Sequence, residues 1–166
     1  MKIIKYILFS LVGLLASASF SACESPDKEF EHDNNLIAWM QLCLRPGAQG
    51  LPGVIEEYDA NGNLVPANEV TVERVKGGYG VISFVLDLDY KGEYDPEHCY
   101  LNTGLTFDEV IKPGLAGIKN ITNRNAEGVA QGIKMTVHSG IGTTREYTVI
   151  GYFDGEYQVA PKAPEN

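Results

Sequence analysis

The sequence has little positive charge, and this shortage limits what the protein can bind. Among 166 residues, 13 are Lys or Arg and 22 are Asp or Glu, so the formal net charge is −9. Removing the first 22 residues takes away Lys2 and Lys5 but no acid, and leaves the rest more acidic still. Phosphate backbones repel such a surface. We therefore expect no nucleic acid among the partners of this chain.

Cysteine and histidine are also scarce, with three residues of each type. They form no CxxC pair and no Cys/His cluster, the spacings that are typical of a zinc site. The sequence contains no G-x-S-x-G nucleophile elbow and no glycine-rich phosphate loop between a strand and a helix. We therefore expect no metal, no cofactor and no enzymatic activity.

No apolar run is long enough to span a bilayer, which needs about 20 residues. The run at residues 6–15 (YILFSLVGLL) follows the basic residues Lys2 and Lys5 and precedes a stretch of mostly small residues, ASASFSA. This three-part order is typical of a secretory signal peptide. We assign residues 1–22 to this signal, and a transmembrane helix is the less favoured alternative.

The end of the predicted signal carries a recognisable motif. Phe20-Ser21-Ala22-Cys23 resembles the lipobox of bacterial lipoproteins, although Leu is usual where Phe20 stands. The resemblance implies cleavage between Ala22 and Cys23, followed by diacylglycerol on Cys23 and acylation of its new amino group. Two or more acyl chains anchor a protein stably to a membrane. The alternative is ordinary cleavage after Ala22, which leaves Cys23 as an unmodified thiol.

Residues 23–35 contain the lipidation site and then a polar, acidic stretch with one proline. Such a stretch cannot bury enough apolar surface to fold, so it predicts a solvated tether. An acidic run directly after the lipidated Cys23 resembles the surface-export signal of Bacteroidetes lipoproteins. This resemblance implies a lipid-anchored protein of the outer membrane that faces the cell exterior. A plain spacer at the periplasmic face is the alternative.

The rest of the sequence shows no convincing helical period, and short apolar runs alternate with Gly, Pro and Asn. Residues 133–138 alternate with period two, with Ile133, Met135 and Val137 on one face, as a half-buried strand requires. The pattern predicts an all-β fold, a single antiparallel β-sandwich of eight or nine strands over residues 36–153, and the resemblance described below implies that this sandwich is Ig-like. Residues 154–166 are expected to form a loose tail. The expected strands include residues 36–44, 54–58, 64–66, 70–75, 81–89, 100–107, 133–138 and 146–153.

Two acidic segments invite comparison with cation sites. Asp59-Ala60-Asn61-Gly62-Asn63 begins like a calcium loop, but Leu64 and Val70 stand where the loop needs Gly and Glu. A hairpin turn explains the Asn-Gly pair better. The second segment fits no ligand spacing and is interpreted as a solvated acidic loop. It contains Asp87, Asp89, Glu93, Asp95 and Glu97.

The C-terminal half carries a pattern similar to the last strands of Ig-like and cadherin-like sandwich domains in Bacteroidetes surface lipoproteins. The pattern comprises residues 106–117 (TFDEVIKPGLAG), 132–140 (GIKMTVHSG) and 144–149 (TREYTV). Ser139-Gly140 departs from it, because an acidic residue usually precedes this glycine. The family is a domain of unknown function, so the resemblance implies a fold and no catalytic residues.

The two remaining cysteines leave two outcomes open. Cys43 lies in an apolar run and Cys99 directly precedes another. An exported protein can join them as a disulfide. Equally, each can be a separate buried thiol that packs as a small apolar side chain.

Aromatic residues offer the main candidates for ligand contact, because exposed rings stack on sugars and anchor protein contacts. Trp39 lies in an apolar run, so we expect it to pack in the core rather than to bind a ligand. The candidates fall in expected loops or chain ends: Tyr79, Tyr90, Tyr94 and Tyr157.

These features favour a non-catalytic lipoprotein of the cell surface that serves as a binding or accessory module for a glycan or a protein. One alternative is a structural subunit of a surface or fimbrial assembly, which presents an open groove or a donated strand. Another is a small extracytoplasmic enzyme or an enzyme inhibitor. A pocket that joins His98 or His138 to a carboxylate and a hydroxyl would favour that last alternative.

Overall fold

The structure is a computed structural model that describes residues 32–44, 49–86, 94–96, 98–106, 108–118 and 120–153. All of them belong to the second of two compact units, His32–Asn166. The expected signal peptide, Cys23, the tether before residue 32 and the tail 154–166 lie outside the described residues. So do two of the candidate tyrosines, Tyr90 and Tyr157.

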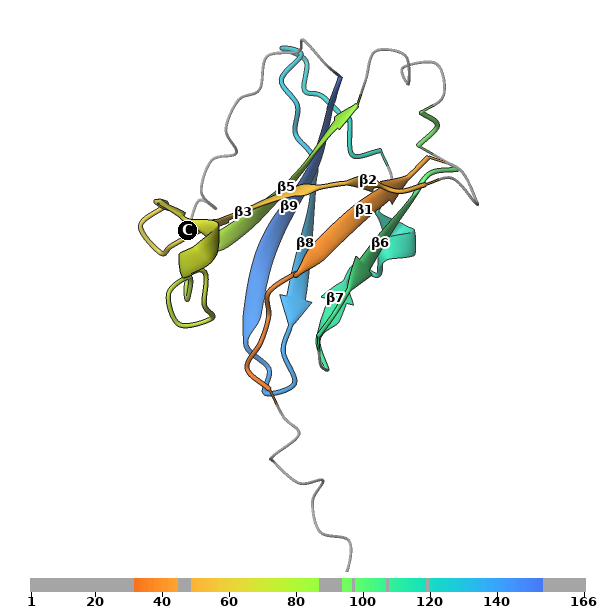
Figure 1. Cartoon of the computed structure of the whole chain (residues 1–166). Helices are drawn as coiled ribbons and strands as arrows, with labels where there is room; N and C mark the ends of the chain where they lie inside the picture. The colour runs from red at the N-terminus through yellow and green to blue at the C-terminus, as the bar shows by residue number, and fades with distance from the viewer. Residues whose placement is uncertain are drawn as a thin grey trace, which may run out of the picture. The chain divides into compact units, whose positions relative to one another are not determined.

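In the described part of the chain, nine strands form two sheets that pack face to face as a β-sandwich (Figure 1). The smaller sheet has the order β2-β1-β6 and the larger has the order β4-β3-β5-β9-β8-β7. No α-helix occurs among the described residues, which contain two short 3-10 helices, η2 (Ala67–Glu69) and η4 (Leu115–Gly117). The all-β prediction is therefore confirmed. The strands are β1 (Trp39–Cys43), β2 (Leu51–Pro52), β3 (Val54–Tyr58), β4 (Leu64–Val65), β5 (Tyr79–Leu86), β6 (Tyr100–Gly104), β7 (Val110–Lys112), β8 (Ile133–His138) and β9 (Thr144–Phe153).

One strand pair differs from the fully antiparallel sandwich that the sequence predicts. β5 and β9 pair in parallel along their whole shared length, from Tyr79 opposite Glu146 to Leu86 opposite Phe153. A parallel pair requires a crossover connection. Here the chain leaves β5, forms β6 in the other sheet, and returns through β7 and β8 before β9. The sandwich is thus mixed at the centre of its larger sheet.

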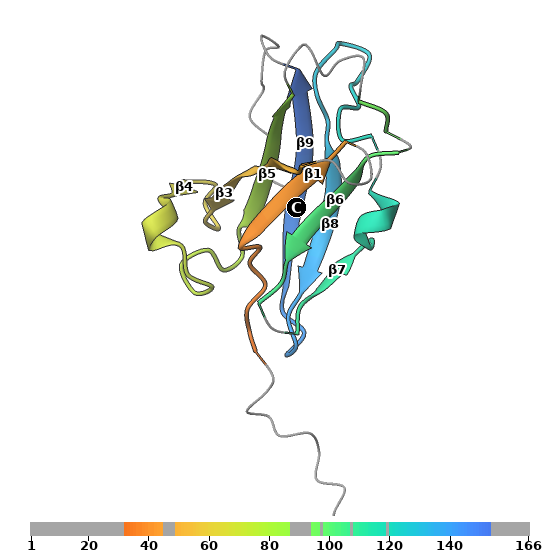
Figure 2. The same ribbon diagram turned by 45° about the vertical axis from the view of Figure 1, so that its right-hand side comes forward.

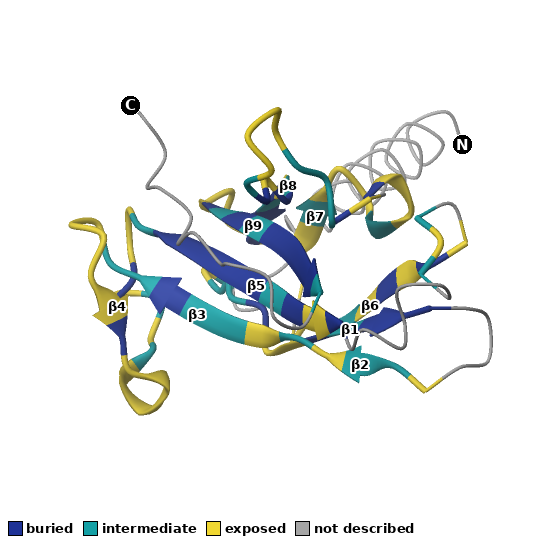
Figure 3. Cartoon of the chain, turned by 90° about the horizontal axis from the view of Figure 1, so that it is seen from above, coloured by how far each residue is buried: buried dark blue, intermediate teal, exposed yellow. Residues whose placement is uncertain are grey.

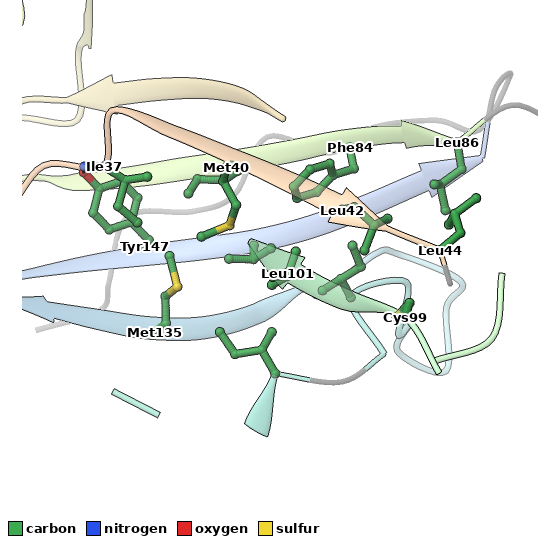
Figure 4. Packing of buried hydrophobic residues seen from close by; sticks show 14 of the residues in the cluster. Ile37, Met40, Leu42, Leu44, Phe84, Leu86, Cys99, Leu101, Met135 and Tyr147 are labelled. Carbon is green, nitrogen blue, oxygen red and sulfur yellow. The ribbon is translucent and has the colours of Figure 1, made fainter. Parts of the chain in front are cut away.

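The core lies between the two sheets and follows the predicted alternation (Figure 4). Met40, Leu42 and Leu101 point inward from the small sheet and are at most 5% exposed. Met135 and Val137 of β8 face them and are fully buried, as expected for their strand. Figure 3 shows that burial concentrates on the central strands β5 and β9, whereas β4 at the sheet edge is largely exposed.

The predicted hairpin at residues 59–63 is present between β3 and β4. The Asp59 carboxylate accepts hydrogen bonds from the amides of Asn61 and Asn63, both at 2.9 Å, and Gly62 has φ +78°. The bonds from Asn63 lower the pKa of Asp59. This carboxylate therefore organises a turn, as the hairpin interpretation requires.

The strand expected at residues 70–75 is absent, and consecutive turns occupy residues 72–77. The amide of Val75 donates to the Thr71 carbonyl at 3.1 Å, and the Thr71 hydroxyl accepts from Arg74 N. Only Val75 of this segment is buried, at 1% exposed. Local hydrogen bonds to Thr71 outweigh the β propensity of the valines, because propensity is a weak preference that context overrides.

Residues 32–35, which the sequence predicts to belong to the tether, contact the folded unit. The segment before β1 is fixed to the turn between β8 and β9. Ile141 N donates to the His32 carbonyl, Asn35 Nδ2 donates to the Thr143 hydroxyl, and Asn34 Nδ2 donates to Glu109. Asn35 is only 8% exposed. Residues 32–35 are thus part of the folded unit and not of a solvated tether.

Candidate functional site

The outer face of the small sheet carries an exposed row of aromatic and amide side chains. Trp39 pairs with Gly104, Gln41 with Asn102, and Cys43 with Tyr100 across β1 and β6. Directly paired residues in a sheet point to the same face, and along each strand these outward residues alternate with residues that point into the core. Figure 2 shows that β1 and β6 lie side by side in front of the larger sheet. We call Trp39, Gln41, Tyr100 and Asn102 the aromatic-amide face.

Trp39 is the most prominent member of this face. Its side chain is 43% exposed, which makes it one of the largest exposed apolar groups of the described residues. A Cβ atom at Gly104 would overlap the indole Nε1, so the ring lies directly over the glycine of the neighbouring strand. The Thr103 hydroxyl donates to the Trp39 carbonyl and ties the two strands at this point. The expectation that Trp39 packs in the core is therefore wrong.

Tyr100 provides the second aromatic ring, and it is 41% exposed. A hydrogen bond with the thiol of its cross-strand partner Cys43 raises the pKa of Tyr100. The phenol therefore stays neutral well above physiological pH. The ring stands four residues along β6 from Gly104, which places it about 13 Å from the Trp39 position along the strand direction.

Two neutral amides lie between the aromatic rings. Gln41 and Asn102 are opposite each other, and Gln41 also pairs with Pro52 of β2. A Cβ atom at Gly50 would lie 2.8 Å from Gln41 Oε1, so the backbone of residue 50 closely flanks this side chain. Asn102 and Pro52 are exposed. The face thus combines two rings with amides that can donate and accept hydrogen bonds.

Two of the candidate tyrosines, Tyr79 and Tyr94, lie among the described residues, and each packs against another ring. Tyr79 is 8% exposed and starts β5, where it stacks on Tyr58 with ring centroids 4.8 Å apart. Tyr94 is half-buried and contacts the Phe153 ring edge-on at 6.3 Å, and burial raises the pKa of Tyr94 to about 12. Both rings pack against other rings, and Tyr79 lies in a strand and not in the loop that the sequence predicts.

The two cysteines take the second of the outcomes that the sequence left open. Cys43 and Cys99 are both buried, and no disulfide joins them. Cys43 lies on the outer face of the small sheet opposite Tyr100, whereas Cys99 belongs to the core cluster on the inner side. Cys43 pairs with Tyr100, and Cys99 is the residue before Tyr100. Because successive side chains along a strand point to opposite faces, the Cys43 and Cys99 side chains leave the sheet in opposite directions.

Histidines and carboxylates gather in pairs rather than in larger sites. His98 Nδ1 lies 2.6 Å from Asp95 Oδ2 on an exposed turn, and His32 Nδ1 lies 3.9 Å from Asp108 Oδ1. His138 is half-buried at the end of β8. Within the described ranges no group of three or more His, Cys, Asp or Glu side chains could hold a metal ion. Likewise, no helix in this part of the chain is long and apolar enough to cross a membrane.

The only deeply buried ion pair among the described residues connects strands that are not neighbours. Arg145 of β9 donates from Nε to Glu57 Oε2 of β3 at 2.8 Å, and its other nitrogens donate to the carbonyls of Tyr58, Val75 and Tyr79. Tyr147 donates from its hydroxyl to Glu57 Oε1 at 2.6 Å. Burial raises the pKa of Glu57 against the opposing effect of Arg145, and it also raises the pKa of Tyr147. Every carboxylate oxygen has a partner, so this network supports the fold.

A groove lies between the segment before β1 and the edge of the larger sheet. This groove of about 630 Å³ is bounded by residues 34–38 on one side and by Ile55, Leu64, Val65 and Pro66 on the other. Leu64 is 55% exposed at the edge strand β4. The groove is mainly apolar and open to solvent, with the carboxylate of Glu56 among its lining groups.

The aromatic-amide face is the surface that sequence reasoning missed, although the sequence contains a signal for it. In residues 36–44 (LIAWMQLCL) the polar Gln41 shares its parity with Trp39, which indicates that Trp39 lies on the solvent side of the strand. Comparisons of the chain with models of protein families, with curated proteins and with solved structures find no match.

Proposed function

We propose that this chain is an exported, lipid-anchored binding module that uses the aromatic-amide face to hold a ligand outside the cell. The N-terminal features support export and anchoring through Cys23 at the outer membrane, with the domain on the outer side. The observation that carries the binding role is the exposed indole of Trp39. A large aromatic ring on a flat sheet costs solvation, and such rings are enriched where proteins make contacts.

The short linker between the lipid site and the domain fits this role. The folded unit begins at His32, next to the β8–β9 turn. The stretch from Cys23 to His32 can span at most about 30 Å. A lipid on Cys23 would therefore keep the β8–β9 end of the sandwich close to the bilayer and hold the ligand-binding sheet near the membrane surface.

We propose no catalytic role for the module. The carboxylates with displaced pKa values serve the fold: Glu57 accepts from Tyr147 and Arg145, and Asp59 accepts from the amides of a turn. His98 and His138 lie apart, one on an exposed turn and the other on β8. Neither is joined by a described hydrogen bond to a serine or threonine hydroxyl, which a nucleophile–base pair requires.

The proposal is tested in two steps. Cells that express the wild type or Cys23→Ser are grown with labelled palmitate, and only the wild type should take up the label. The Cys23→Ser chain is then screened against polysaccharides and purified surface proteins, beside the double variant Cys23→Ser/Trp39→Ala. The proposal requires a ligand whose binding is lost with Trp39→Ala. Label in Cys23→Ser, or no Trp39-dependent ligand, contradicts it.

The groove beside β4 favours a second candidate, a structural subunit of a surface assembly. Such subunits accept a strand from a neighbour along an open apolar groove. The exposed Leu64 and the short edge strand β4 are compatible with that arrangement. Size-exclusion chromatography of the Cys23→Ser chain discriminates the two, because ladders or filaments favour the subunit and a monomer favours the binding module.

A further inference from the structure

We infer that the ligand of the aromatic-amide face is a neutral polysaccharide, bound along the length of its chain rather than at one end. This inference rests on the proposed function and names the class of ligand for the same surface. It follows from three properties of the face: the spacing of its rings, the nature of the groups between them and the absence of charge on its described members.

The first property is the spacing of the two rings. Trp39 and Tyr100 are 43% and 41% exposed and lie about 13 Å apart along the strand direction. Pyranose rings present a C–H face that packs against an aromatic ring. Two platforms at this separation contact two sugars of one chain with further sugar between them. A monosaccharide could contact only one of the rings.

The second property is the chemistry of the strip between the rings. Gln41 and Asn102 form a cross-strand pair at its centre. An amide side chain offers both donor and acceptor atoms, which match the hydroxyl groups of a sugar. Gly104 carries no side chain, and the indole of Trp39 lies over this position while the residue stays 43% exposed. A strip that runs along the strands between two exposed rings suits contact with several sugars of one chain rather than with a single terminal sugar.

The third property is the lack of charge. The chain as a whole carries a formal charge of −9, and the outward residues of β1 and β6 include no Asp, Glu, Lys or Arg. A uronate or sulfate chain would meet an acidic protein, with no compensating cation among the described outward residues of β1 and β6, and like charges repel. Neutral sugars match the face as it stands.

The test uses Trp39 itself as the reporter, because it is the single tryptophan of the sequence. The exported chain carrying Cys23→Ser is titrated with the neutral polysaccharides glucomannan, mixed-linkage β-glucan and xylan, and with the anionic alginate and polygalacturonate. Indole emission and its quenching by acrylamide are followed. We expect at least one neutral polysaccharide to shift the emission to shorter wavelength and to protect Trp39 from acrylamide.

Variants confirm that the signal comes from the proposed strip. Tyr100→Ala keeps the reporter and should weaken binding about tenfold, the effect of losing a contact worth more than 1 kcal/mol. Val85→Ala is the matched control, since Val85 is 53% exposed on β5 of the other sheet and should leave affinity unchanged. Circular dichroism of each variant verifies that the fold is intact.

The outcomes separate this inference from the proposed function. Protection by alginate or polygalacturonate alone, or neutral binding that Tyr100→Ala leaves unchanged, overturns the neutral-chain inference. Protection of Trp39 by a purified surface protein and by no polysaccharide also overturns it, while the binding module stands. If no probe of either class protects Trp39, both proposals fail.

Discussion

Arg145 and Glu57 form a buried ion pair that reaches across a whole strand, because β5 lies between β9 and β3. Their side chains are 2% and 5% exposed, and the shortest nitrogen–oxygen distance is 2.5 Å. Isolated charges are very costly in such surroundings, and these two are compensated by each other and by backbone carbonyls. The pair joins the three strands, and the turn at residues 72–77, into one unit.

Glu57→Gln should therefore destabilise the protein strongly. The change leaves the Arg145 guanidinium buried without its counter-charge, which costs about 3–5 kcal/mol of unfolding free energy. Urea unfolding followed by circular dichroism measures it. Lys134→Ala is the control, because Lys134 and Glu146 form an exposed pair at 2.8 Å whose loss should cost less than about 1 kcal/mol. Equal losses for the two variants would show that burial of the pair is unimportant.

Gly80→Ala should disturb the same region by a steric route. The Tyr147 ring crosses the β5 backbone at Gly80, and a Cβ atom there would overlap ring atoms Cδ1 and Cε1. We expect a loss of about 1–3 kcal/mol, the usual cost of overpacking. Gly114→Ala provides the comparison, since it has φ −56° and no atom within 4 Å of the new Cβ. If Gly80→Ala is as stable as Gly114→Ala, the Tyr147 ring can adopt another position without loss of stability, which would contradict this prediction.

The free energy of unfolding should decrease at alkaline pH, above about pH 10. Burial raises the pKa of Tyr94 from 10.0 to about 12, so the folded chain keeps its phenolic proton where the unfolded chain loses it. The unfolded state then binds fewer protons, and the free energy of unfolding decreases as the pH rises from about 10 to about 12. Urea midpoints at pH 8, 10 and 11 measure this slope. Tyr94→Phe removes one contributing group and should make the slope less steep, while Tyr147, whose pKa burial also raises, keeps part of it. An unchanged slope would contradict the assignment.

Asn35→Ala should loosen the start of the domain. Asn35 is 8% exposed and donates to the Thr143 hydroxyl at 3.3 Å, which ties the segment before β1 to the β8–β9 turn. The loss of a buried hydrogen bond costs about 1 kcal/mol. Asn102→Ala is matched in chemistry but lies on the exposed face, where the change should stay within about 0.5 kcal/mol. Thermal melts of both variants test whether residues 32–35 belong to the fold.

Features that depend on neighbouring residues could be predicted from the sequence, whereas features that depend on contacts between distant residues could not. β3 and β8 begin and end where the alternating patterns predict, because period two within one strand is enough to define them. The valines at 70–75 predict a strand, but this segment forms turns because Thr71 accepts local hydrogen bonds that a propensity scale does not include. The Arg145–Glu57 pair could not be found, because 88 residues separate its members in the sequence.

In the candidate site, too, contacts between different strands decide what the local sequence does not. The apolar neighbours of Trp39 favour a core position, and only the parity of Gln41 points to the solvent side, where β1 and β6 place the indole. Tyr79 was expected in a loop, and it is buried because Tyr58 of the paired strand stacks on it. In both cases the deciding neighbour comes from another strand.

The sequence by itself determined the strand-rich composition, the alternation that separates core from surface, the acidic charge and the N-terminal features on which the membrane anchor is proposed. Only the tertiary structure decided that β5 and β9 run parallel, that Cys43 and Cys99 leave their sheet in opposite directions, and that Trp39 and Tyr100 share an exposed face. The physical reason is that period and composition are local properties of the chain. Strand order and register instead join residues whose separation in sequence carries no information about their distance in space.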